Sequence, residues 1–255
     1  MSVSIPILLY HRIDHGASST PASVFAAHMA YLAARKIRTL TLDEFEQILG
    51  GRQALTTPAV LLTFDDGSVD CLHEVLPVLE ANDQFATGFL ITGRMRGSQP
   101  LGQYDNALSW DEARELVRSG RFQFQSHSHS HTQWPFDQGG IDALAAELAL
   151  SRETLARELD RPIEEFRHLA WPWGRCNLDF ERIAAQLGYS YQYLVQTGSV
   201  KHLHLTQRLP RICCDGMPLQ TFRHWLELTT SGPLSGPVNL AFGLYRKARH
   251  GMGYW

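Results

Sequence analysis

Two adjacent carboxylates, Asp65 and Asp66, end an apolar run and are followed by a glycine. The run reads LLTFDDG over residues 61–67. In parallel α/β folds, ligands and reactive groups gather where strands end, so both side chains are expected to reach solvent there. Neighbouring carboxylates repel each other unless a cation or a proton intervenes, which favours one as a metal ligand and the other as a base. Taken alone, the pattern is equally typical of a strand-to-helix turn capped by an aspartate.

Three histidines alternate with serine in QSHSHSHT, residues 125–132. His127 and His131 would share one face of a helical turn, whereas His127 and His129 would lie on one side of an extended segment. Either pair could bind one ion together with a carboxylate and leave positions for water and substrate, as in hydrolytic zinc sites. We therefore predict a divalent metal ion, zinc first, with nickel, cobalt and iron also compatible with these donors.

Two tryptophans flank a proline in LAWPWG, residues 169–174. Indole faces at the edge of a polar site suit sugar rings, although the same residues also suit a core. The backbone N–H of Trp173 could donate to an oxyanion, since Pro172 has none to give. The side chains expected to contact substrate are Trp171, Trp173, Trp134 and Tyr10.

The elements that must position these residues alternate along the chain. Short apolar runs rich in β-branched and aromatic residues predict strands over 5–9, 59–64, 85–91, 122–125, 169–171 and 191–195. Helical spacing of apolar residues predicts helices over 22–35, 42–49, 69–81, 111–119, 141–159 and 178–187. This order predicts an α/β fold, with parallel strands covered by helices in a barrel or an open doubly wound sheet.

The composition excludes several classes of protein. With 44 % apolar and 19 % charged residues, the 255-residue chain is neither disordered nor collagen-like. Its 23 basic against 26 acidic side chains leave no cationic excess, so we expect no nucleic-acid partner. The four cysteines include no C-x-x-C pair and are interpreted as buried thiols.

The chain also lacks the features of export and of membrane insertion. No apolar run approaches the roughly 18–20 residues that cross a bilayer. A secretory signal requires basic residues before its apolar stretch, and none precede the first apolar run here. We therefore expect a cytoplasmic protein with one catalytic domain over residues 1–236. The tail, residues 237–255, mixes apolar and basic side chains, which would suit peripheral contact with an anionic membrane surface.

Together these segments resemble the polysaccharide deacetylase family, the NodB-homology carbohydrate esterases of family 4, from about residue 7 to residue 212. TFDDG resembles the first family motif, and His127, Ser128 and His131 match the second, H-S/T-x-x-H. LAWPWG is similar to the third motif in its permuted form, found in the branch that acts on poly-N-acetylglucosamine, and RLPRI over 208–212 also resembles that branch. The resemblance implies an irregular (β/α) barrel of about seven parallel strands.

The same resemblance implies a metal-dependent hydrolase that removes N-acetyl groups from amino sugars of a polysaccharide or its precursor. It assigns the general base to Asp65, the oxyanion donor to the N–H of Trp173, and the metal to Asp66, His127 and His131. In the permuted branch an early Tyr-His supplies the general acid, here His11 after Tyr10. His204, in a Leu-x-His-like context, is the competing acid.

The sequence departs from the family pattern in two places. Ala170 stands where other members have the third-motif arginine that orients the base. Arg211 is our first candidate for a replacement and Arg167 the second. A fourth motif of the Asp-Arg type is not recognisable.

Two other functions fit part of the pattern. His127 with His129 could be the H-x-H pair of a different metal-dependent amidohydrolase or phosphoesterase, in which His129 would be essential and His131 spare. Alternatively, the chain could be a non-catalytic carbohydrate-binding relative that kept the fold and the aromatic residues.

Overall fold

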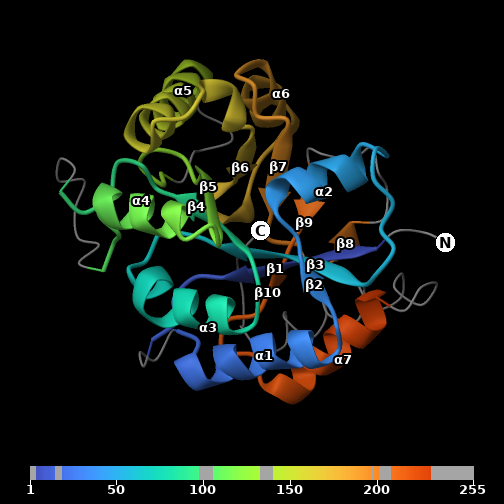
Figure 1. The fold of residues 1–255 in the computed structure, drawn as a ribbon. Helices are drawn as coiled ribbons and strands as arrows, with labels where there is room; N and C mark the ends of the chain where they lie inside the picture. The colour runs from blue at the N-terminus through green and yellow to red at the C-terminus, as the bar shows by residue number, and fades with distance from the viewer. Residues whose placement is uncertain are drawn as a thin grey trace, which may run out of the picture.

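The structure is a computed structural model that describes residues 4–14, 19–97, 106–132, 140–196, 198–200 and 208–230. Its strands are β1 (Ile5–Tyr10), β2 (Arg38–Thr39), β3 (Ala59–Phe64), β4 (Ala86–Leu90), β5 (Phe122–Ser126), β6 (His168–Ala170), β7 (Tyr191–Leu194), β8 (Ser199–Val200), β9 (Leu209–Pro210) and β10 (Ile212–Cys213). Its α-helices are α1 (Ala22–Ala34), α2 (Leu42–Leu49), α3 (Leu76–Ala81), α4 (Trp110–Arg118), α5 (Ile141–Leu159), α6 (Leu178–Gln186) and α7 (Leu219–Thr230). Figure 1 shows the helices arranged around the strands.

The strands form a nearly closed parallel barrel. They lie in the order β10-β1-β3-β4-β5-β6-β7-β9, and each pair along this path is parallel. Its two ends, β9 and β10, are separated in the chain by Arg211 alone, so one extended segment pairs with β7 through Leu209 and with β1 through Ile212. Residues 209–213, here called the closing segment, join the two edges of the sheet. The predicted α/β class and the barrel of about seven parallel strands are therefore confirmed.

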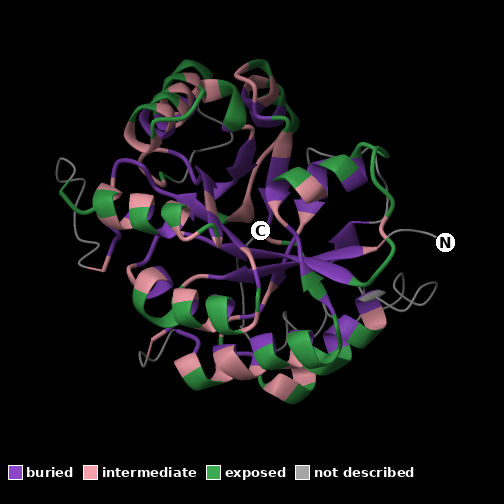
Figure 2. Ribbon diagram, viewed as in Figure 1, coloured by how far each residue is buried: buried purple, intermediate pink, exposed green. Residues whose placement is uncertain are grey.

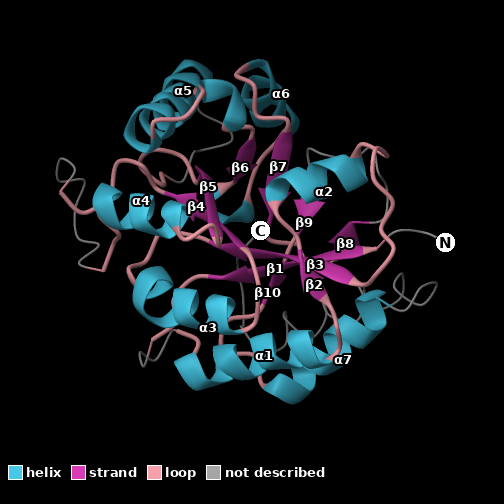
Figure 3. Cartoon of the chain, viewed as in Figure 1, coloured by secondary structure: helices cyan, strands magenta, loops and turns pink. Residues whose placement is uncertain are grey.

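The barrel strands are buried on both faces. Every residue of β1 and β3 is buried, as expected where helices cover a parallel sheet (Figure 2). Alternate residues, such as Ile7, Leu61 and Phe89, form one cluster inside the barrel with apolar side chains of α2. Leu8 and Leu62, on the opposite face, pack against the outer helices. Figure 3 shows the same two layers, a central sheet and a surrounding shell of helices.

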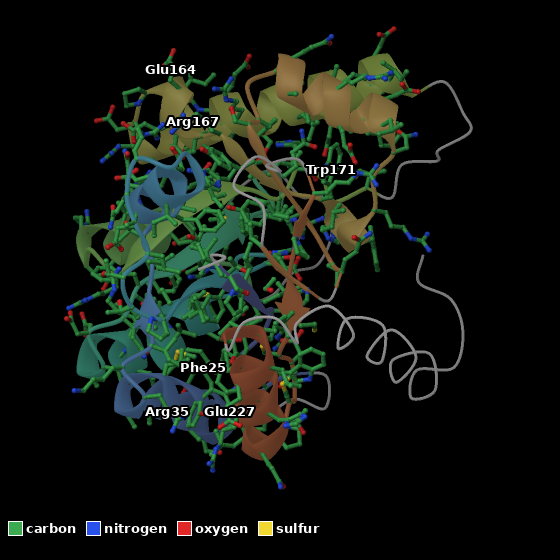
Figure 4. All side chains as sticks on the ribbon, turned by 90° about the vertical axis from the view of Figure 1, so that its right-hand side faces the viewer. Phe25, Arg35, Glu164, Arg167, Trp171 and Glu227 are labelled. Atoms are coloured by element: carbon green, nitrogen blue, oxygen red, sulfur yellow. The ribbon has the colours of Figure 1, made fainter. Side chains whose placement is uncertain are left out.

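Most predicted elements agree with the observed ones to within a residue or two at either end. The expected helix over 69–81 is instead a π-helical turn, Cys71–Val75, that continues into α3. The sequence did not lead us to expect α7, which packs beside α1 and forms an Arg35–Glu227 ion pair at 4.0 Å (Figure 4). The two-residue strands β2, β8, β9 and β10 were also not expected.

The remaining expectations concern thiols and the membrane. All four cysteines are free, but only Cys71 and Cys214 are buried, so the interpretation as buried thiols is wrong for Cys176 and Cys213. No helix in the described ranges is long and apolar enough for a bilayer span. The tail over 237–255 lies outside the described residues.

Candidate active site

Asp65 lies at the end of β3 and is held in place from two sides. Its backbone N–H donates to the carbonyl of Tyr10 at 2.9 Å, which continues the β1–β3 pairing by one residue. Its carboxylate accepts hydrogen bonds from Nη1 and Nη2 of Arg211 at 2.6 and 2.7 Å, and both side chains are buried. Burial alone would raise the pKa of Asp65, but the charge and the hydrogen bonds of Arg211 lower it to about 2. The carboxylate is therefore ionised at neutral pH and oriented by a planar two-point contact.

Arg211 reaches Asp65 from the closing segment. It is fully buried, lies over the ring of Phe89 at 5.5 Å from the ring centroid, and its Nε donates to the carbonyl of Leu194 at 3.4 Å. The structure thus brings our first candidate for the missing third-motif arginine to the predicted base. The second candidate, Arg167, instead pairs with Glu46, a residue of α2.

Asp66, His127 and His131 converge on one point beside Asp65. The Oδ1 atom of Asp66 lies 3.5 Å from Nε2 of His127 and 3.8 Å from Nε2 of His131. This Oδ1 is buried and has no hydrogen-bond partner in the structure, which is the environment expected of an oxygen that coordinates a cation. One donor atom from each of the three residues lies within 4.8 Å of the others.

The tautomer of His127 fits a metal ligand. Its Nδ1 donates to the carbonyl of Ala170 at 2.7 Å, so the lone pair of Nε2 is directed toward Asp66. Burial lowers the pKa of His131 to about 3. His131 is therefore a neutral imidazole, the form that coordinates a metal. One carboxylate and two imidazoles make up the protein ligands of a hydrolytic site, and they fit a divalent cation.

Four residues of this region have left-handed backbone conformations that side chains other than glycine rarely adopt. They are Asp66, Ser128, His131 and Trp173, with φ of 71°, 65°, 60° and 61°. Each such residue costs on the order of 1–2 kcal/mol. The surrounding contacts must therefore hold these turns in shape.

Glu147, on α5, holds the turn that carries the histidines. Its Oε1 accepts hydrogen bonds from the backbone N–H of His129 at 3.0 Å, from the N–H of Ser130, and from Oγ of Ser130 at 2.7 Å. The next turn of the helix contributes Ser151, whose Oγ lies 2.8 Å from that of Ser126. Sequence reasoning missed Glu147, because its only signal is an acidic side chain on a helix that follows the histidines.

Replacing Glu147 with Ala should weaken metal binding without removing a ligand. The three donors on the turn would lose their acceptor, and we expect the dissociation constant of the metal to rise about 10- to 100-fold, as when other outer partners of metal ligands are removed. Chelator competition measures this constant. Glu153, exposed on the same helix, provides the matched Ala control. Equal affinities in the two variants would rule out this positioning role.

His129 is not part of the group formed by Asp66, His127 and His131. Its Nδ1 lies 3.0 Å from Oγ1 of Thr92, and its carbonyl accepts the N–H of Gly93 at 2.8 Å. The pair that converges on Asp66 is thus His127 and His131, the i,i+4 pair, and not the H-x-H pair of the competing function.

His11 and Asp215 form an ion pair at the neighbouring strand end. Asp215 accepts the backbone N–H of His11 at 3.0 Å through Oδ1, and its Oδ2 lies 2.5 Å from Nδ1 of His11. Burial would lower the pKa of His11, but the hydrogen bond and charge of Asp215, with smaller contributions from Asp65 and Asp66, raise it to about 9. His11 is therefore a protonated imidazolium at neutral pH, suited to donate a proton.

Asp215 is a functional candidate that the sequence analysis missed. It is the carboxylate partner of the predicted acid, His11. The available signal was weak: Asp215 and Gly216 follow an apolar run, just as Asp66 and Gly67 do. The competing acid, His204, lies outside the described residues.

The aromatic residues divide into buried and exposed ones. Trp173 is 48 % exposed, and its ring centroid lies 5.2 Å from that of His131. Trp171, labelled in Figure 4, is 1 % exposed. Its Nε1 donates to Oε1 of Gln192 at 3.0 Å, and its ring stacks on Phe180. The prediction that Trp171 contacts substrate is therefore wrong, because its indole belongs to the core.

Tyr10 is likewise a core residue, and the prediction that it contacts substrate is wrong. It is fully buried, its hydroxyl lies 2.8 Å from Nδ1 of His28, and its ring packs on Phe25 and Phe64. Because successive strand residues point to opposite faces, Tyr10 is directed to the outer helices. Trp134 lies outside the described residues, so its predicted contact stays a prediction.

Comparison with known proteins gives one family. A family model described as "Polysaccharide deacetylase" matches residues 52–192. The chain is 26 % identical over 227 residues to the Bacillus subtilis (strain 168) protein YxkH, a match that covers 88 % of this chain and 76 % of YxkH.

Two solved structures share the fold. The Streptococcus pyogenes deacetylase PplD, solved in complex with acetate, superposes with a TM-score of 0.77 at 24 % identity, over 89 % of this chain and 100 % of PplD. IcaB from Ammonifex degensii superposes with a TM-score of 0.78 at 22 % identity, over 88 % of this chain and 97 % of IcaB. Since the family match spans more than half of the sequence, the chain belongs to the polysaccharide deacetylase family, whose members are hydrolases that remove acetyl groups from polysaccharides.

Proposed function

We propose that the chain hydrolyses the N-acetyl amide of an acetylated amino sugar, in a polymer or its precursor, with Asp65 as base and His11 as acid. The observation that carries this proposal is the convergence of three metal-ligand side chains beside an ionised, arginine-bound carboxylate, with an imidazolium at the adjacent strand end. Asp65 and His11 follow paired residues of β3 and β1, so they lie side by side.

The metal would be held by Asp66, His127 and His131. Bound there, a divalent cation such as zinc supplies Lewis-acid chemistry, since it polarises an acyl oxygen and lowers the pKa of water. Nickel, cobalt and iron fit the same donors, and zinc is our first choice because two imidazoles and one carboxylate are typical of hydrolytic zinc sites.

The protein's own groups would move the protons. Asp65 accepts a proton from the attacking water, and Arg211 keeps its carboxylate facing that water. The backbone N–H of Trp173 donates to the developing oxyanion. His11 donates its Nε2 proton to the leaving amine, because its Nδ1 is bound to Asp215. The products are acetate and the free amino sugar.

Replacement of Asp215 with Asn should shift the alkaline limit of activity. Because the acid must be protonated, kcat/KM of the wild type is expected to fall above about pH 9. Without the carboxylate charge, the pKa of His11 returns to 6.5 or below, and at pH 8 the protonated fraction falls about 30-fold. A pH profile of kcat/KM measures the shift. If kcat/KM of Asp215→Asn fell at the same alkaline pH as that of the wild type, His11 would be excluded as the acid and His204 would be favoured.

Trp173 would bind sugar through its indole as well as its N–H. Trp173→Ala keeps the backbone donor and removes the exposed ring, so KM should rise about tenfold, equivalent to about 1.4 kcal/mol, while kcat changes much less. Trp173→Tyr, which keeps an aromatic face, should restore most of the affinity. A fall in kcat at unchanged KM would contradict a role in binding.

A panel of N-acetylated glycans tests the proposal as a whole. Acetate release is measured on the metal-loaded protein, with metal analysis of the same sample. Release of one acetate per free amine formed would support the function. Glycan binding without acetate release under any divalent ion would favour the non-catalytic relative. Cytoplasmic location and contact of the tail over 237–255 with a membrane stay untested predictions.

A further inference from the structure

A second group of metal-ligating side chains lies beside the candidate acid. It consists of His11, Cys213 and Asp215, which offer one nitrogen, one sulfur and one oxygen atom within 4.8 Å of one another. In the described part of the chain, this group and the Asp66 group are the two that bring three such donors together. The proposed mechanism uses His11 and Asp215 but gives no task to Cys213.

The backbone that carries these donors is well defined. Cys213 pairs with Leu9 in the parallel β1–β10 ladder, and the N–H of Cys214 donates to the carbonyl of Leu9 at 2.8 Å. His11 follows β1 by one residue, so the imidazole and the thiol leave adjacent strand ends. The Sγ of Cys213 already donates to Oδ2 of Asp215 at 3.3 Å. All three residues are partly exposed, so an ion can reach them from solvent.

We propose that His11, Cys213 and Asp215 form a second cation site, selective for thiophilic divalent ions such as zinc and cadmium. A thiolate and a carboxylate together offset the two charges of the cation, whereas the Asp66 group supplies one carboxylate. Thiolate ligands favour zinc-like ions strongly over magnesium, calcium and manganese. A water completes a four-coordinate zinc site.

Occupation of this site blocks the proton donor, a consequence that rests on the proposed function. The cation displaces one proton from Nδ1 of His11 and one from Sγ of Cys213, so two protons are released to solvent. His11 then remains as a neutral imidazole with only its Nε2 proton, which it does not give to an amine. An ion at the Asp66 group therefore activates the enzyme, and an ion at the Cys213 group inhibits it.

Cobalt titration of the metal-stripped full chain tests the site directly. Cobalt bound to thiolate gives a charge-transfer absorption in the near ultraviolet, which the sulfur-free Asp66 group does not produce. We expect this absorption in the wild type, its loss in Cys213→Ser, and its retention in Cys176→Ser. Cys176 is the matched control, since it is also partly exposed and its thiol donates to a carboxylate, that of Glu181, at 3.2 Å. Bound metal should fall from two ions per chain to one in Cys213→Ser.

Zinc inhibition gives the functional readout. Each variant is compared with its own maximum activity in a zinc titration. We expect at least about a tenfold lower activity at saturating zinc than in Cys213→Ser, relative to that maximum, for the wild type and for Cys176→Ser. If Cys213→Ser does not fold, an alkylation experiment on the wild type replaces this variant. We expect bound cadmium to protect Cys213 from an alkylating reagent, as measured by mass spectrometry.

The outcomes separate the cation site from the proposed function. One ion per chain at saturation, an absorption that survives Cys213→Ser, or alkylation unaffected by cadmium would overturn the site. A cysteine-dependent absorption in a protein that releases no acetate would instead keep the site and reject the proposed function.

Discussion

The Asp65→Asn variant is expected to bind its metal and to lose at least about a hundredfold in kcat. The group formed by Asp66, His127 and His131 does not include Asp65, so the ion held by these three residues should stay bound. Removal of a positioned general base typically costs about 10²- to 10⁴-fold, and here the base is also the side chain that Arg211 orients. Acetate release and metal analysis of the same preparation provide both measurements.

This variant also leaves a buried cation without its counter-charge. Breaking a buried ion pair costs about 3–5 kcal/mol, so the unfolding temperature of Asp65→Asn should fall, and activity must be assayed well below that temperature. Full activity in the folded variant would eliminate Asp65 as the base. Loss of the metal would instead assign Asp65 to the ligand set.

His131→Ala and His129→Ala should differ in metal content. His131 contributes one of three protein ligands, so its removal should weaken metal binding by at least about 100-fold and abolish activity. His129 contacts Thr92 outside this group, and the His129→Ala variant should keep the ion at Asp66, His127 and His131 and most of the activity. Dialysis against a weak chelator, followed by metal analysis, distinguishes them.

The reverse result would change the class of reaction. If His129→Ala lost the ion and His131→Ala kept it, the H-x-H pair of an amidohydrolase or phosphoesterase would be the better description. His127→Ala cannot make this distinction, since both arrangements use that side chain.

The long strands and helices could be predicted because their sequences carry strong periodic signals. Strands such as β3, buried on both faces, appear as unbroken apolar runs, and α5 keeps its apolar residues at helical spacing. The two-residue strands lack any such period. The closing segment has its shape imposed by pairing with β7 and β1, which are distant in sequence.

The candidate metal ligands could be predicted because their spacing and order resemble a family pattern. The directions in which the tryptophan side chains point could not be predicted. Trp171 and Trp173 would point to the same side of an extended chain, but the turn at Pro172 and the positive φ of Trp173 send one indole into the core and the other outward. The pairing of Asp215 with His11 depends on neighbouring strands that are distant in sequence, since 204 positions separate the two residues.

The closing segment has a consequence for how the protein is synthesised. The nascent chain carries Asp66, His127 and His131 once residue 131 has left the ribosome, yet the partners of the acid and the base, Asp215 and Arg211, emerge last among the site residues. Until they dock, Asp65 has no guanidinium to oppose its charge, and His11 keeps the lower proton affinity of an unpaired imidazole. The protein thus becomes catalytically competent only when the closing segment joins the two edges of the sheet. A ribosome-bound fragment that stops before residue 209 would be inactive.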